Sequence, residues 1–284
     1  MKYSNFIFVA TFIFFALVSC SSDDSNNVEM DPLLDLEQLN ISYGNSSDQV
    51  FDLYLPANRT TETKTLILIH GGGWTSGDKA DMNPFKDYIK NQLPDYAIVN
   101  MNYRLADENN QPYPMQINDI TSVVNYLKAN QTSYVVSDDV GFVGISAGAH
   151  LSLLWSYAFD LESQVEMVCS IVGPTNFTDP EYLNNVDPIL QEILDAFGTD
   201  TSISFLEEVS PYHQVTVSAP PTILFYGEQD PLIPTTQGTA MRDKLEALNI
   251  THEFNLYPNE GHGWVGLNLL DTSIKLKTFI ETYM

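Results

Sequence analysis

The strongest constraint on the fold is a corner in the chain at "VGFVGISAGAHLSLL", residues 140–154. Only Ser146 separates the strand-like run VGFVGI from the helix-forming run AGAHLSLL. Gly144, Ser146 and Gly148 form the pattern G-x-S-x-G, which is typical of a strand-to-helix turn too tight for a side chain at either glycine. The pattern predicts a buried strand that leads at once into a helix, with an exposed serine at the edge of the sheet.

Apolar runs and helical patterns alternate along most of the chain. The alternation favours an α/β fold in which a mostly parallel central sheet has helices on both faces. The expected strands are 49–56, 65–70, 96–103, 140–145, 165–173, 222–227 and 252–258, and the expected helices are 115–130, one that begins after Ser146 and runs to about residue 158, 236–248 and 271–283.

The alternation breaks between Gly173 and Pro220. This part of the chain is rich in Asp-Pro pairs, aromatic residues and acids, and it has one amphipathic stretch from Ile189 to Phe197. We interpret residues 174–215 as a small cap insertion over the carboxyl ends of the strands, where open parallel sheets bind ligands.

The first 20 residues have the features of an export signal. Lys2 precedes an apolar run over 6–18, which is short for a membrane span and of the length found in signal peptides. The following "LVSC", residues 17–20, resembles the bacterial lipobox. The resemblance implies that residues 1–19 are a lipoprotein signal peptide and that Cys20 is lipidated; a plain secretory signal and a membrane anchor are the alternatives.

Residues 20–36 are expected to be a disordered tether because their start, SSDDSNNVEMD after Cys20, is polar, acidic and without periodicity. This stretch is also similar to the acidic export signals of surface lipoproteins. We therefore expect a lipid-anchored protein of the bacterial cell envelope, on the outer membrane and at the cell surface. Residues 37–284 are long enough for one catalytic domain. With Cys20 modified, Cys169 has no partner for a disulfide.

The net charge bears on the partners of the protein. Acidic residues number 37 against 12 basic ones, which gives a formal charge of −25. Nucleic acid and anionic membrane surfaces would be repelled, so contact with a membrane is expected only through the lipid anchor. A neutral substrate or polymer fits this charge, and solubility alone is an equally good reading of it.

A serine nucleophile needs a base and an acid that orients the base. His262 lies in the glycine-flanked loop "NEGHGW" after the last expected strand, whereas His150 falls in a helix and would be held too rigidly. Asp230 follows the strand 222–227 and precedes a proline, with Glu228 as the alternative acid. The order Ser146, Asp230, His262 is that of the α/β-hydrolases.

The loop "HGGGW", residues 70–74, follows the buried strand 65–70. Glycines there allow backbone N–H groups to approach a ligand closely. We predict that Gly72 and Gly73 form an oxyanion hole together with Ala147, whose N–H lies at the positive end of a helix. His70 is expected to brace the loop.

Together these residues resemble the α/β-hydrolase family and, within it, the esterases with an HGGG loop. The stretches "YGNSSDQVFDLYLP", "LILIHGGGWTSGDK" and "NYRL" narrow the resemblance to bacterial feruloyl and acetylxylan esterase-like (BD-FAE-like) lipoproteins. The resemblance implies a serine carboxylic-ester hydrolase that needs no metal or organic cofactor. The sequence shows no P-loop, dinucleotide fingerprint or Cys/His metal spacing.

The expected substrate is an acylated plant polysaccharide of the hemicellulose type, from which acetyl or feruloyl groups are removed. A general carboxylesterase or lipase is the first alternative, and a wide apolar cap pocket would favour it. A prolyl-type serine peptidase is less favoured because the chain has no room for the large propeller domain that such enzymes usually carry. Arylformamidase-like hydrolases are less favoured because they usually lack an export signal. A non-catalytic surface adhesin would not need a serine, an acid and a histidine at the positions of Ser146, Asp230 and His262. The sequence predicts no oligomeric state.

Overall fold

The structure is a computed structural model that describes residues 33–184, 195, 197 and 200–284. Its centre is an eight-stranded sheet in the order β1-β2-β4-β3-β5-β6-β7-β8. From β4 to β8 all neighbouring strands are parallel, and β2 pairs antiparallel with both β1 and β4. The strands are β1 (Leu36–Ser42), β2 (Val50–Leu55), β3 (Thr65–Ile69), β4 (Ala97–Met101), β5 (Val140–Ile145), β6 (Val165–Ile171), β7 (Thr222–Gly227) and β8 (His252–Tyr257).

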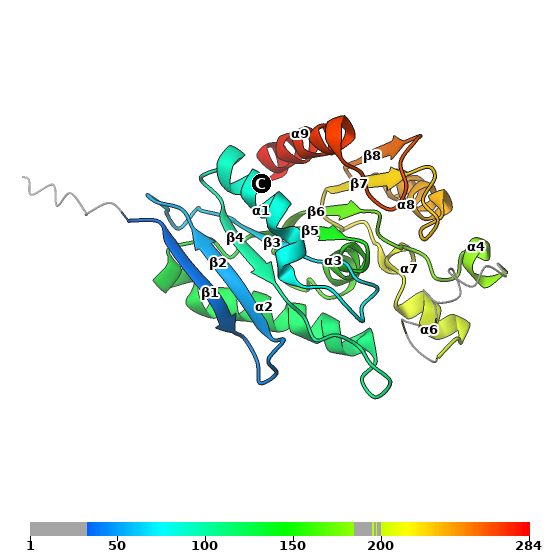
Figure 1. Ribbon diagram of the computed structural model, residues 1–284, viewed down its shortest axis with the longest axis horizontal. Coiled ribbons are helices and arrows are strands. Elements are labelled where there is room, and N and C mark those ends of the chain that lie inside the picture. The colour runs from blue at the N-terminus through cyan, green and yellow to red at the C-terminus, as the bar shows by residue number, and fades with distance from the viewer. Residues whose placement is uncertain (1–32, 185–194, 196, 198–199) are drawn as a thin grey trace, which may run out of the picture. The chain divides into compact units, whose positions relative to one another are not determined.

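Helices cover both faces of this sheet, as the sequence predicted. Figure 1 shows α1 and α9 on one side and α2 along the other. The helices are η1 (Lys79–Met82), α1 (Asn83–Gln92), α2 (Pro112–Tyr134), α3 (Ala147–Ala158), α4 (Pro180–Leu183), α6 (Ile203–Glu208), α7 (Pro211–Gln214), α8 (Thr235–Ala247) and α9 (Gly266–Tyr283).

The continuous apolar run of β3 divides between two hydrophobic cores. Ile67 and Ile69 pack in the core that also contains residues of α2, α3 and α8, whereas Leu66 and Leu68 pack in the core with residues of α1 and α9. Successive side chains of a strand point to opposite faces. A strand that is buried on both faces therefore needs apolar residues on both, and the run LILI after Thr65 meets that need.

The elements that were not predicted from the sequence are strand β1, helix α1 and the short helices η1, α4, α6 and α7. Strand β1 is exposed along its length except for the half-buried Ile41, so it lacks the apolar alternation that marks a strand. It begins at Leu36, inside the range expected for the tether. Helix α1 buries only Phe85 and Ile89, one turn apart, which is too weak a pattern to indicate a helix from sequence alone.

The cap segment, residues 174–215, includes the short helices α4, α6 and α7. Most of the predicted amphipathic stretch from Ile189 to Phe197 lies outside the described residues. Phe197 itself is described and is buried, with its ring stacked on Phe177 at 5.1 Å between centroids. No described helix combines the length and the apolar composition needed to cross a bilayer.

Candidate active site

Ser146 occupies the corner between β5 and α3 with a strained backbone, at φ 53° and ψ −119°. A Cβ atom at Gly144 would lie 2.4 Å from the carbonyl oxygen of Gly148, and a Cβ at Gly148 would lie 2.3 Å from the carbonyl oxygens of Ile69 and His70. Both positions therefore require glycine. The corner places the serine at the carboxyl end of a central parallel strand.

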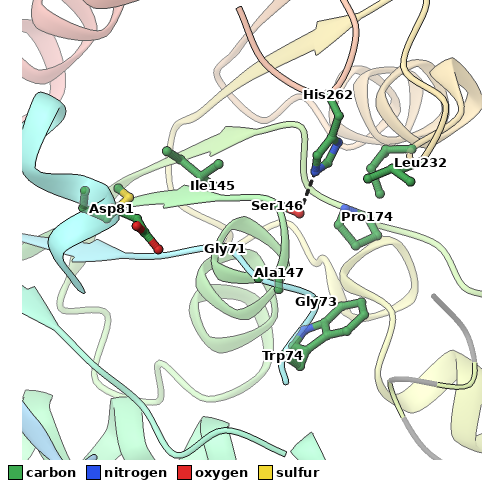
Figure 2. Close-up of a pocket in the computed structure, with 13 residues that line it drawn as sticks. Gly71, Gly73, Trp74, Asp81, Ile145, Ser146, Ala147, Pro174, Leu232 and His262 are labelled. Carbon is green, nitrogen blue, oxygen red and sulfur yellow. Dashed lines mark hydrogen bonds between the residues drawn. The ribbon is translucent and has the colours of Figure 1, made fainter. Parts of the chain in front are cut away.

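His262 and Asp230 reach Ser146 from the loops that follow β8 and β7. His262 Nε2 lies 2.9 Å from Ser146 Oγ (Figure 2). His262 Nδ1 lies 2.8 Å from Asp230 Oδ2. Because an ionised carboxylate only accepts hydrogen bonds, Nδ1 carries the proton and Nε2 can accept the proton of the serine hydroxyl. The structure thus brings together three side chains that are far apart in the sequence.

Asp230 is held by the backbone that follows it. Its side chain is fully buried, and Oδ1 accepts hydrogen bonds from the N–H groups of Leu232 at 2.8 Å and Ile233 at 3.0 Å. Glu228, the alternative acid, is exposed. The geometry therefore selects Asp230 as the partner of His262.

The glycine loop after β3 passes directly beside the serine. A Cβ atom at Gly71 would lie 3.2 Å from Ser146 Cβ. Within the described part of the chain, nothing accepts a hydrogen bond from the N–H groups of Gly72, Gly73 or Ala147. These three residues line the same cavity as Ser146, and Ala147 is the first residue of α3, where helix N–H groups have no intrahelical partner. Such groups can stabilise negative charge on a substrate oxygen.

His70 supports this loop rather than facing the serine. Its Nδ1 donates a hydrogen bond to the carbonyl oxygen of Gly71 at 2.7 Å, and its ring stacks on Tyr103 with 4.2 Å between centroids. The Tyr103 hydroxyl in turn donates to the carbonyl oxygen of His70 at 3.0 Å. Burial lowers the pKa of His70, against the opposing effects of the Gly71 hydrogen bond and of the nearby Asp81 and Asp78.

A second support for the glycine loop comes from Gln116, Trp74 and His150. Gln116 Nε2 donates to the carbonyl oxygen of Trp74 at 2.7 Å. Trp74 Nε1 donates to His150 Nδ1 at 3.2 Å, and His150 Nε2 donates to the carbonyl oxygen of Val209 at 2.8 Å. His150 is fully buried. It therefore connects the glycine loop, the helix α3 and the end of the cap segment, and it cannot serve as the base.

The remaining histidines lie elsewhere. His213 Nε2 is 2.7 Å from Thr178 Oγ1 in the cap segment. His252 begins β8, as expected. In the described ranges no group of three His, Cys, Asp or Glu side chains could hold a metal ion.

Ser146 opens into a cavity of about 520 Å³. Figure 2 shows Trp74, Pro174 and Leu232 on one side of Ser146 and Asp81 on the other. Two tryptophans lie next to loops of the site in the sequence, Trp74 after the glycines and Trp264 after His262. Trp74 does line the cavity, whereas Trp264 packs on Tyr257 and donates to Thr272 Oγ1 at 2.8 Å. The lining residues that sequence reasoning missed are Asp81, Met82, Ile145, Pro174, Leu232 and Ile233.

The mostly parallel sheet, the strained serine after β5 and the linked Ser146, His262 and Asp230 define an α/β-hydrolase with the site of a carboxylic ester hydrolase. The BD-FAE family profile matches residues 51–245. The chain belongs to this family.

Known relatives agree with this class. Esterase LipC of Mycobacterium tuberculosis is 26% identical over 250 residues, which cover 81% of this chain and 60% of LipC. A truncated carbohydrate esterase from gut microbiota has a TM-score of 0.70 at 19% identity, with 86% of this chain and 96% of that chain covered. An acetyl ester-xyloside bifunctional hydrolase from Caldicellulosiruptor lactoaceticus has a TM-score of 0.68 at 16% identity, with 82% and 88% covered. At these identities the two structures show the fold alone.

Proposed function

We propose that the protein is a serine carboxylic-ester hydrolase that removes acetyl or feruloyl groups from hemicellulose-type polysaccharide. The observation that carries the chemistry is the chain of contacts from Ser146 Oγ through His262 to Asp230, 2.9 Å and 2.8 Å long. Ser146, at one end of this series of contacts, lines a cavity together with Gly72, Gly73 and Ala147. The backbone N–H groups of these three residues have no hydrogen-bond acceptor in the described part of the protein.

In the proposed reaction, Ser146 Oγ attacks the ester carbonyl carbon while His262 Nε2 takes the hydroxyl proton. The N–H groups of Gly72, Gly73 and Ala147 bind the oxygen that becomes negative, and each such donor typically contributes about 3 to 4 kcal/mol. His262 then gives its proton to the departing alcohol oxygen, which leaves the acyl group on Ser146. A water molecule, deprotonated by His262, releases the acid and restores the serine. Asp230 stays ionised and holds the imidazole in place.

Two observations support a carbohydrate ester as the substrate. The fold is shared with a carbohydrate esterase and with an acetyl ester-xyloside hydrolase. No lysine or arginine is found among the described residues that line the cavity, and the chain has a formal charge of −25, so a neutral substrate is favoured. A general carboxylesterase for small esters is the second candidate, which the apolar wall of Trp74, Pro174 and Leu232 favours.

A product-release panel separates these candidates. Acetate and ferulate released from plant xylan would be measured beside hydrolysis of p-nitrophenyl acetate, p-nitrophenyl butyrate and a Gly-Pro amide. We expect release from xylan and a preference for short acyl chains. A preference for long acyl chains with no release from xylan would favour the general esterase, and cleavage of the amide would favour a peptidase.

We also propose that Cys20 is lipidated after removal of residues 1–19 and that the protein is anchored to the bacterial cell envelope at the outer membrane and its surface. Residues 1–32 lie outside the described residues, so support comes from the sequence "LVSC" and the apolar run before it. Metabolic labelling with a fatty acid should mark the wild type and spare Cys20→Ser. Equal labelling of the two would refute the proposal.

A further inference from the structure

We propose that Asp81 sets the substrate selectivity of this site by accepting a hydrogen bond from a hydroxyl group of the carbohydrate portion of the ester. The inference rests on the proposed esterase function. It adds a residue that the catalytic chemistry does not use, together with the chemical group that this residue recognises.

Asp81 is held in one orientation by the start of a short helix. Its Oδ2 accepts a hydrogen bond from the N–H of Asp78 at 3.0 Å, and Asp78 Oδ1 accepts one from the N–H of Ala80 at 2.8 Å. The first of these bonds is one half of a capping box at the start of η1, in which the Asp78 side chain also accepts from the N–H of Asp81. A carboxylate has about four acceptor positions, so most of the capacity of Asp81 remains for a ligand. Figure 2 shows its carboxylate extending from η1 toward the loop at Gly71.

The protein does not neutralise this carboxylate in its described part. Asp81 takes part in none of the ion pairs there. The adjacent Lys79 is engaged by Asp52, with Nζ 2.8 Å from both carboxylate oxygens. The exposed carboxylate is therefore left to bind donors in the cavity, and it repels an anionic substrate.

The two sides of the cavity differ in chemistry because only the Asp81 side carries a carboxylate, although the apolar Met82 and Ile145 also line that side. On the side opposite Asp81, Trp74, Pro174 and Leu232 present an apolar wall suited to an acyl group. On the Asp81 side, an ionised oxygen can accept the O–H of a sugar ring, and such charge-assisted hydrogen bonds are about twice as strong as neutral ones. We therefore assign the acyl group to the Trp74 side and the carbohydrate alcohol to the Asp81 side.

A matched pair of esters tests this assignment. A mono-O-acetylated methyl xyloside and cyclohexyl acetate both carry an acetyl group on a six-membered ring, but only the xyloside has free hydroxyl groups. The measured quantity is the ratio of kcat/KM for the xyloside to kcat/KM for cyclohexyl acetate. Asp81→Asn keeps an acceptor for the N–H of Asp78 and removes the charge, and we expect it to lower this ratio about tenfold.

Asp87→Asn is the control variant, because it removes the same charge from an exposed side chain of α1 that does not line the cavity. Its ratio should equal that of the wild type. An unchanged ratio in Asp81→Asn, or an equal loss on both esters, would overturn the inference while the esterase function stands. Failure of the wild type to hydrolyse either ester would instead overturn the proposed function and this inference with it.

Discussion

The buried histidine of the nucleophile helix makes folding stability depend on pH in a defined direction. His150 is enclosed by the rings of Trp74, Phe177 and Phe197, and its two ring nitrogens are used by Trp74 and by the carbonyl oxygen of Val209. Because Trp74 Nε1 can only donate, His150 Nδ1 must remain unprotonated to accept it. Protonation of the ring would therefore break this contact as well as bury a charge.

The size of the effect follows from the pKa values. Burial lowers the pKa of His150 from 6.5 to about 4, although the hydrogen bond to Val209 opposes this. Between these values the unfolded chain binds a proton that the folded protein does not bind, so the unfolded state gains stability as the pH falls. The contribution of His150 is fully present above about pH 6.5 and is lost toward pH 4. The gap between the two pKa values corresponds to about 3 kcal/mol.

Urea unfolding of the wild type and of His150→Gln at a series of pH values between 4 and 8 measures this effect. Carboxylates titrate in the same range in both proteins, so the comparison isolates the histidine. The free energy of unfolding of the wild type should fall by about 3 kcal/mol more than that of His150→Gln between pH 7.5 and pH 4. Parallel pH profiles for the two proteins would refute the reasoning.

Three further substitutions test the site. Gly148→Ala puts a methyl group against two backbone carbonyl oxygens and should lower the free energy of unfolding by about 1 to 3 kcal/mol or more. An unfolding midpoint in urea equal to that of the wild type would contradict the tight turn described at Ser146. Asp230→Asn should lower kcat for p-nitrophenyl acetate by about 10⁴-fold with little change in melting temperature, and a loss below tenfold would show that another group orients His262. Trp74→Phe keeps a ring but removes the donor to His150, which should cost about 1 to 2 kcal/mol in urea unfolding; an unchanged midpoint would mean that this hydrogen bond adds no stability.

Much of the fold could be predicted because each central strand carries its own signal. Runs such as TLILI and VGFVGI are apolar on both faces, which only a strand buried between helices requires. Strand β1 gave no such signal, since it is an exposed edge that is held by pairing with β2. Helix α1 was missed for the related reason that it buries two residues only.

The juxtaposition of Ser146, Asp230 and His262 was predictable because each residue directly follows a strand or lies in the loop after it. The carboxyl ends of parallel strands meet at one edge of the sheet, so spacing along the chain does not matter. Asp81 and Leu232 could not be predicted in this way. They reach the cavity through local loop and helix geometry, namely the capping box of η1 and the turn at Asp230, which have no apolar periodicity.

Labelling with a fluorophosphonate tests the central claim most directly, because the reagent reacts with a serine only where a base activates it and an oxyanion site stabilises the adduct. The wild type should take up one equivalent of the reagent, and peptide mapping should place it on Ser146. Ser146→Ala should take up none, and His262→Ala should react far more slowly. An unlabelled wild type, or a label that persists in Ser146→Ala, would contradict the account.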